Sequence, residues 1–380
     1  DPQGVLAQPT FDGQQFVAKA KGAQGHRTFF VQYRQGSFQW WRPVDIHVTP
    51  LLDWQHNPEA GQLAVTVTNQ GSQPLLGVLS LNGKTLSKRF TLPSDVPTTL
   101  PVNASVVRMG TNRYSLVTSD STYTYDAINW NLPQPKKLRY EPVTLKSHFN
   151  DAIRNIFAYG KYLTPRWPYT TLQVPTQGMG QWCHPASLSN IDDQGLRAKA
   201  GTEGRITFPQ GIPFNTPGDS LSPNVILTTL WDNYPDAVTL PLSGKASRLY
   251  LLVAASTYHM QAHVLNGSLE VTYADGSTET LELILPDNLL PLDQDLFVDD
   301  FAFTMGQPKP WRIRLKTGDM MRYPMAELGL KMSNDPITVD GGMATLLDMV
   351  LDPAKPLRSL TLRTTANEVI IGLMGATLVR

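Results

Sequence analysis

Residues 231–260 are the part of the sequence that most restricts the fold. An aromatic loop, Trp231 to Tyr234, leads into a segment of alternating apolar and polar residues, and a Ser-Gly-Lys turn then precedes a nearly continuous apolar run over 249–254. The alternating apolar positions are Val238, Leu240 and Leu242. Short alternation is typical of a strand buried on one face, and a short apolar run is typical of a strand buried on both. The stretch therefore predicts a β-sandwich.

The N-terminal third of the chain also has the pattern of short strands separated by turns. Residues 62–69 alternate cleanly, and Asn82-Gly83 is a strong hairpin signal. The chain holds 30 Pro and 28 Gly among its 380 residues, which suits many short strands that need many turns. We predict an N-terminal β segment over residues 1–41 and an immunoglobulin-like sandwich over residues 42–131.

A Pro-rich linker, a helix and a bridging loop are expected over residues 132–194. The helix is predicted at Leu145 to Tyr162, where apolar residues cluster on one helical face. Over residues 195–380 the pattern returns to short strands and predicts a jelly roll. The predicted fold class is therefore mostly β: an immunoglobulin-like β-sandwich followed by a jelly-roll β-sandwich, with one short helix in the connection.

The charge of the chain bears on its partners. Lys plus Arg and Asp plus Glu number 32 each, so the chain lacks the positive field that attracts phosphate backbones, and we expect no nucleic-acid partner. No apolar run is long enough to span a membrane. The single cysteine, Cys183, excludes an intramolecular disulfide and a multi-cysteine metal site. A polysaccharide or oligosaccharide stays open as a partner, because aromatic faces and hydrogen bonds hold neutral sugars without net charge.

Three segments of the sequence resemble one protein family. They are the run Pro165 to Pro185, the block Leu230 to Pro235 with the Gly244-Lys245 turn, and the run Ser359 to Gly375. Together they look like the β-sandwich portions of large secreted proteins of unknown function from polysaccharide-utilising bacteria. Larger members of that family are linked to a six-hairpin glycosidase-like helical domain.

The resemblance implies a location and a role. It implies a bacterial protein that is secreted, periplasmic or on the cell surface. The sequence begins at Asp1 without a signal segment, and we expect it to be a mature or trimmed form. A six-hairpin toroid needs many helices and one is predicted here, so the resemblance implies an ancillary or carbohydrate-binding role beside a partner glycosidase domain. It carries over no catalytic residue.

Two aromatic loops are the candidate glycan-binding sites. Sugar rings stack on aromatic planes, and a neighbouring carboxylate or amide can hold their hydroxyl groups. The first loop offers Trp231, Asp232, Asn233 and Tyr234, and the second offers Trp167, Tyr169, Trp182 and His184. In the alternative interpretation, these aromatic residues plug one end of a sandwich or pack across a domain boundary, where a cleft is also a usual ligand site.

Other polar residues could carry chemistry, and each has a plainer interpretation. Cys183-His184 has the residue types of a thiol nucleophile and its base, but adjacent positions rarely form that pair. His259 and His263 have the spacing of a helical metal site, but their surroundings predict strand and turn. The acidic runs are Asp192-Asp193, Asp293-Gln-Asp295 and Asp299-Asp300. They could serve hydrolysis, hold a structural calcium ion or be solvated turns; no other cofactor is expected, and the catalytic residues are unknown.

The function we predict is an extracytoplasmic glycan-binding or ancillary module of a bacterial polysaccharide-degradation system. The alternatives are a glycoside hydrolase or a fragment of one, and a purely structural module that positions a partner enzyme. Binding predicts exposed Trp or Tyr faces, and hydrolysis predicts two carboxylates about 5–10 Å apart in a cleft. A structural module predicts neither, with Trp231 and Trp182 buried.

Overall fold

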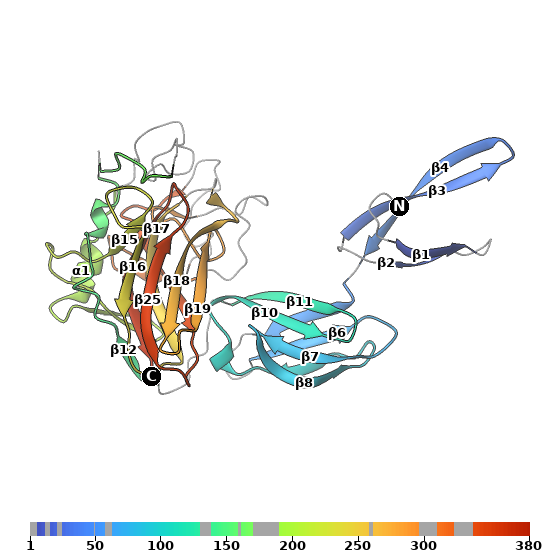
Figure 1. The fold of residues 1–380 in the computed structure, drawn as a ribbon, viewed down its shortest axis with the longest axis horizontal. Coiled ribbons are helices and arrows are strands. Elements are labelled where there is room, and N and C mark those ends of the chain that lie inside the picture. The colour runs from blue at the N-terminus through green and yellow to red at the C-terminus, as the bar shows by residue number, and fades with distance from the viewer. Residues whose placement is uncertain are drawn as a thin grey trace.

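The computed structural model describes residues 6–11, 16–20, 25–48, 50–57, 63–129, 138–158, 161–169, 190–257, 261–295, 310–322 and 337–380. Most of these residues lie in strands, which confirms the predicted β class. They build two apolar cores, one from residues 52–127 and a larger one that draws mainly on residues 145–379. Figure 1 shows the two groups of strands that surround these cores. The immunoglobulin-like and jelly-roll topologies and the domain boundaries remain predictions.

Two antiparallel hairpins precede the first core. They are β1 (Leu6–Phe11) with β2 (Phe16–Ala20), and β3 (Gly25–Gln35) with β4 (Phe38–Val48). Trp40 and Trp41 are adjacent in β4, so their side chains lie on opposite faces of the hairpin, and both are exposed. Tyr33 of β3 stacks on Trp40, with 5.3 Å between ring centroids. The Trp40-Trp41 pair is therefore an exposed patch and not part of a core.

Two sheets enclose the first core and form the first sandwich. In spatial order, one contains β5 (Leu52–Asn57), β6 (Ala64–Asn69) and β9 (Thr98–Pro101), and the other contains β11 (Thr122–Asn129), β10 (Gly110–Val117), β7 (Leu75–Leu81) and β8 (Lys84–Leu92). A 3-10 helix, η1 (Ala104–Val106), follows β9. Val65 and Val67 of β6 are fully buried, as the alternation predicts. Asn82 and Gly83 connect β7 to β8 with φ of 50° and 78°, the positive values typical of this turn.

A larger pair of sheets shares the second core and forms the second sandwich. In spatial order, one contains β12 (Tyr140–Pro142), β26 (Ile370–Val379), β17 (Arg248–Ser256), β24 (Met343–Val350), β21 (Arg312–Arg314) and β22 (Met320–Met321), with β15 (Ile226–Thr229) also paired to β26. The other contains β16 (Ala237–Pro241), β25 (Leu357–Thr364), β18 (Leu265–Tyr273) and β19 (Thr278–Ile284). As the two patterns predict, β17 is buried along its whole length, whereas Leu240 of β16 is buried between exposed neighbours.

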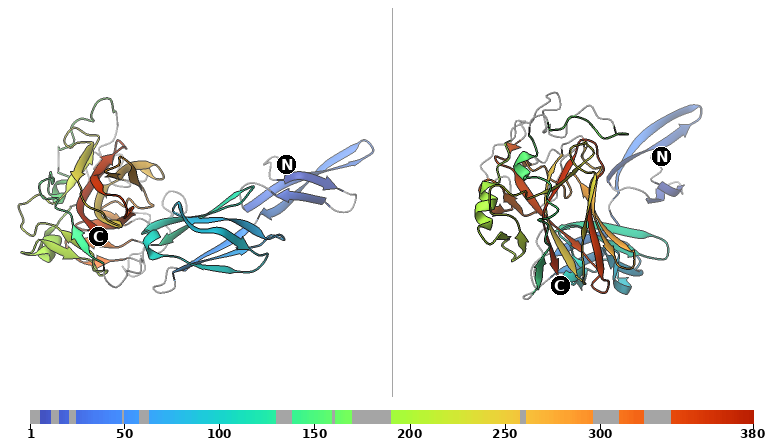
Figure 2. Two further views of the ribbon diagram at one scale, coloured as in Figure 1. Left: turned by 60° about the horizontal axis from the view of Figure 1, so that its bottom comes forward. Right: turned by 60° about the vertical axis from the view of Figure 1, so that its left-hand side comes forward.

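Two short sheets and one α-helix complete the described residues. They are β13 (Arg205–Thr207) with β14 (Pro213–Asn215), β20 (Gln294–Asp295) with β23 (Ile337–Thr338), and α1 (Gln194–Ala200). In the right-hand view of Figure 2, α1 lies on the outside of the second sandwich. No helix in the described part of the chain is long and apolar enough to cross a membrane.

The helix predicted at Leu145 to Tyr162 is wrong. The described part of that segment contains turns and a 3-10 helix, η2 (Ile153–Asn155), and the α-helix lies farther along the chain. The N–H groups of Asn150 and Asp151 both donate to Val225 O, at 3.1 and 3.4 Å, instead of to a helical carbonyl. The side chains of the same two residues also bond backbone groups, which competes with helix formation.

A buried ion pair joins the two sandwiches. Arg248 of β17 pairs with Asp348 of β24, and the Asp348 side chain is fully buried. Arg248 also donates to Ala104 O at 3.1 Å and to Val107 O at 2.7 Å, both in the first sandwich. Asp348 Oδ1 accepts the N–H of Met109 at 2.6 Å, and the Met109 side chain packs in the second core. Both members of the ion pair thus belong to the second sandwich and form hydrogen bonds with backbone groups of the first.

Candidate functional site

The structure brings the described parts of the two aromatic loops together. The backbone of residues 164–166 bonds to the loop that follows β15, at Leu230 over 2.7 Å and at Asp232 over 3.1 Å. The segment that carries Trp167 and Tyr169 therefore runs beside the first candidate loop. Three residues of the second loop lie outside the described residues: Trp182, Cys183 and His184.

The two rings of the first loop are buried, with 5% of Trp231 and of Tyr234 exposed. Trp231 Nε1 donates to Asn367 O at 3.0 Å, and its ring lies edge-on to Tyr162 at a centroid distance of 6.2 Å. The Tyr234 hydroxyl donates to Asp151 Oδ2 at 2.5 Å. Because neither ring has an open face, neither can stack on a sugar in this arrangement, and both support the core.

Asp151 is the polar centre of this buried region. Besides the Tyr234 hydroxyl, its carboxylate accepts Asn155 Nδ2 at 2.7 Å and pairs with the Lys161 ammonium. Burial raises the pKa of Asp151, but the hydrogen bonds from Lys161, Tyr234 and Asn155 outweigh burial and hold the pKa below its ordinary value. Asp151 therefore stays ionised at neutral pH and cannot act as a general acid, and its contacts hold Lys161, Tyr234 and Asn155 together.

Solvent reaches other members of the two loops. Trp167 is 89% exposed, and Tyr169 and Asp232 are exposed to a smaller extent, whereas both amide atoms of Asn233 are buried. Trp167 is thus the most exposed ring of these loops within the described residues. Its predicted role in stacking stays a prediction.

The described acidic residues are held in the fold. Asp193 is fully buried, pairs with Arg197 at 2.9 Å and accepts Asn224 Nδ2 at 2.8 Å. Asp192 Oδ1 accepts the N–H of Gln194, so both acids fix the start of α1. Asp293 is also buried.

The remaining metal and acid candidates fall largely outside the described residues. These are His259, Asp299, Asp300 and the side chain of Asp295. Within the described ranges, no group of three or more His, Cys, Asp or Glu could hold a metal ion. His263, the described member of the histidine pair, is exposed in a turn with φ of 57°. The calcium hypothesis therefore stays a prediction.

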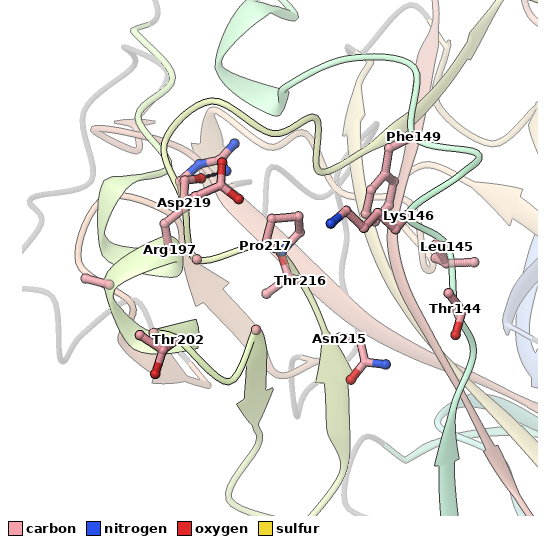
Figure 3. A pocket seen from close by; sticks show the side chains of 14 residues that line it. Thr144, Leu145, Lys146, Phe149, Arg197, Thr202, Asn215, Thr216, Pro217 and Asp219 are labelled. Carbon is pink, nitrogen blue, oxygen red and sulfur yellow. Dashed lines mark hydrogen bonds between the residues drawn. The ribbon is translucent and has the colours of Figure 1, made fainter.

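A pocket of about 710 Å³ opens beside α1 and is called the α1 pocket (Figure 3). Its volume lies within the range of small-molecule sites, about 300–1,000 Å³. Three segments line it: the chain after β12, the end of α1 with the turn that follows, and the end of β14 with the chain after it. The polar and aromatic side chains of the lining include Lys146, Phe149, Arg197, Thr202, Asn215, Thr216 and Asp219.

Arg197 holds two walls of the α1 pocket together. From α1 it donates to the carbonyl of Asp219 and, at 3.0 Å, to Ser222 O. The same walls meet at two glycines, because a Cβ on Gly218 would lie 2.0 Å from Gly201 O. The walls of the pocket are thus held by the two hydrogen bonds of Arg197 and by a close backbone contact at Gly218 that leaves no room for a side chain.

Replacing Gly218 with alanine is expected to lower the free energy of unfolding by about 1–3 kcal/mol, the usual cost of overpacking. The added methyl group would overlap a backbone oxygen, which no side-chain rotation can relieve. Denaturant unfolding measures the change, and Ser220→Ala in the same exposed loop is the control, expected to stay within about 0.5 kcal/mol. Equal stability of the two variants would contradict the contact.

The lining offers an apolar face and hydrogen-bonding groups. Phe149 is half-buried and packs against the second core, so its position is fixed. Thr216 is 2% exposed, and its Oγ1 has no hydrogen-bond partner among the described residues. Asn215 and Thr202 add an amide and a hydroxyl. This arrangement can contact the face of a ring-shaped ligand and bond to its polar groups.

Asp219 is the only carboxylate in the described lining. Its Oδ1 accepts the N–H groups of Leu221 and Ser222, at 3.1 and 2.7 Å. Hydrogen bonds from the Ser222 side chain and backbone lower the pKa of Asp219, so it is ionised at neutral pH. The lining therefore lacks the pair of carboxyl groups, one of them protonated, that glycoside hydrolysis requires.

Reasoning from the sequence does not find the α1 pocket. Its walls come from residues 144–149, 197–204 and 215–219, which are predicted as helix and as strand with turns and lie far apart in the chain. The one local signal is the run Asn215-Thr-Pro-Gly-Asp219, which predicts a loop but no ligand. No protein-family model matches the chain, and no curated protein matches it. Function is therefore inferred from the pocket itself.

Proposed function

We propose that the protein is an extracytoplasmic glycan-binding module of a bacterial polysaccharide-degradation system, and that it holds a saccharide in the α1 pocket. The observation that carries this proposal is the lining, which combines the Phe149 ring, packed against the second core, with the amide of Asn215 and the hydroxyl of Thr202. Such groups hold sugars by contact with the ring face and by hydrogen bonds to hydroxyls. The family resemblance supports the location and the association with a partner glycosidase.

The carboxylates favour binding over hydrolysis. A glycosidase places two carboxyl groups on either side of the scissile bond, and one must carry a proton. In the α1 pocket Asp219 stands alone in the described lining, and it is ionised and bound to backbone N–H groups. Asp151 is ionised as well and is occupied by Lys161 and Tyr234. Neither acid is prepared to protonate a leaving group.

Affinity gel electrophoresis on a panel of plant and host polysaccharides tests the proposal, with reducing-sugar release measured on the same samples. Retarded migration without release is the expected result. Release of sugar would contradict the binding proposal and favour the hydrolase alternative, with the acidic residues outside the described ranges as the next candidates.

Phe149→Ala is expected to weaken saccharide binding by about 2- to 12-fold, because an aromatic contact of this kind contributes about 0.5–1.5 kcal/mol. Thr202→Val removes one exposed hydroxyl of the lining and is expected to weaken binding less than Phe149→Ala does. Trp167→Ala is the control, since Trp167 is exposed and is not in the lining. Loss of binding in Trp167→Ala with full binding in Phe149→Ala would move the site to the aromatic loops.

A second candidate function is a structural module that positions a partner enzyme. The burial of Trp231 favours it, because that interpretation predicts a buried ring there. The shared ion pair of Arg248 and Asp348 favours it too, because it fixes one sandwich against the other. Absence of both retardation and release across the panel would support this second function.

A further inference from the structure

Lys146 is the feature of the α1 pocket that the proposed function leaves unused. Its side chain is exposed, and Figure 3 shows it extending from its own wall toward Pro217 on the opposite one. It forms no ion pair with any residue that the structure describes. An ammonium group thus stands in the pocket without a counter-ion from the described chain.

The nearby acids are already occupied. Asp219 is bound by the N–H groups of Leu221 and Ser222, and Asp193, behind the wall, is bound by Arg197. The charged residues of the described lining are two cations, Lys146 and Arg197, and one anion, Asp219. Because Asp193 neutralises Arg197, Lys146 is the cation of this lining that has no ion-pair partner among the described residues.

Neutral hydrogen-bonding groups accompany this charge. Thr216 Oγ1 is buried and lacks a partner among the described residues, so a ligand gains a hydrogen bond there where the Thr216 side chain turns toward the cavity. Asn215 adds an amide that can donate. The donors of the pocket suit an anion on a ligand whose other groups are hydroxyls.

We infer that the α1 pocket selects a saccharide that carries one anionic group, with Lys146 as its counter-ion and Phe149 against the sugar ring. The inference rests on the proposed function and names its ligand class. The anionic group is the carboxylate of a uronate or a sulfate ester, since a lysine ammonium binds either as a point charge. A charged hydrogen bond of this kind changes affinity by about 10- to 100-fold.

Isothermal titration with three oligosaccharides of equal length tests the inference: an oligogalacturonate, a sulfated galactan fragment and an uncharged galactan fragment. The native protein is expected to bind one of the charged probes most tightly, and which one identifies the anion. Lys146→Met is expected to weaken that binding by about 10- to 100-fold and to leave the uncharged probe unchanged. The affinity of the native protein should fall with added salt, and that of Lys146→Met should fall less.

Lys199→Met is the matched control, because Lys199 lies on α1 but outside the lining of the pocket, and it should bind all three probes like the native protein. Tightest binding of the uncharged probe, or an equal loss for all probes in Lys146→Met, would overturn the choice of an anionic ligand. If Phe149→Ala then lost the uncharged probe, glycan binding in the pocket would still stand. Absence of binding to every probe and to the wider polysaccharide panel would overturn both proposals.

Discussion

Replacing Arg248 with methionine is expected to lower the free energy of unfolding by about 3–5 kcal/mol. The substitution leaves the Asp348 carboxylate, which is 0% exposed, without its counter-ion. Breaking a buried pair costs more than the pair contributes, because the remaining charge has neither water nor a counter-ion. Equilibrium unfolding in denaturant, followed by fluorescence and circular dichroism, measures the loss.

The substitution should also loosen the joint between the two sandwiches. The carbonyls of Ala104 and Val107 lose their donor, although Met109 still donates to Asp348. A double variant, Arg248→Met with Asp348→Leu, removes the unpaired charge, and we expect it to regain part of the lost stability. Recovery should stay incomplete, because three backbone groups of the first sandwich then lack partners.

Arg113→Met is the control for this prediction. Arg113 also forms an ion pair with an aspartate, Asp126, but that pair lies on the surface of the first sandwich. Exposed pairs contribute about 0–1 kcal/mol, so the control should change stability by no more than that. If Arg248→Met cost no more than Arg113→Met, the Arg248–Asp348 pair would not be the buried joint described above.

The sequence predicts well those parts of the fold that are determined by residues adjacent in the chain. The alternating burial of β6 requires only that every second residue be apolar, and the Asn82-Gly83 turn supplies its own positive φ values. The failed helix at Leu145 to Tyr162 has helical spacing of apolar residues too. There Val225, far along the chain, takes the backbone N–H groups that a helix would use. The sequence of residues 145–162 does not reveal that a distant carbonyl group competes for these N–H groups.

The candidate site was harder to predict, for a related reason. Composition identifies loops rich in Trp and Tyr, but it does not distinguish a buried ring from an exposed one. Trp231 is 5% exposed, whereas Trp167 is 89% exposed. The α1 pocket has three walls from distant segments and so has no motif. Lys146 and Phe149 line the cavity together with residues 197–204 and 215–219, which no local pattern brings near them.

Trp231→Ala is expected to lower the free energy of unfolding by about 3–5 kcal/mol, the usual cost of removing a buried aromatic side chain. The substitution leaves a cavity beside Tyr162 and removes the hydrogen bond to Asn367 O. Saccharide affinity of the folded protein should be unchanged, because Trp231 is not in the lining of the α1 pocket. Denaturant unfolding and titration with the tightest-binding oligosaccharide measure the two effects separately.

Trp167→Ala removes the same side chain from the neighbouring segment and serves as the comparison. With 89% of Trp167 exposed, the substitution should change stability by about 0.5 kcal/mol or less. A large loss of stability at Trp231 with none at Trp167 identifies the first aromatic loop as part of the core. If Trp231→Ala instead lost binding without losing stability, this ring would reach solvent and belong to the binding site. The α1 pocket would then not be the saccharide site.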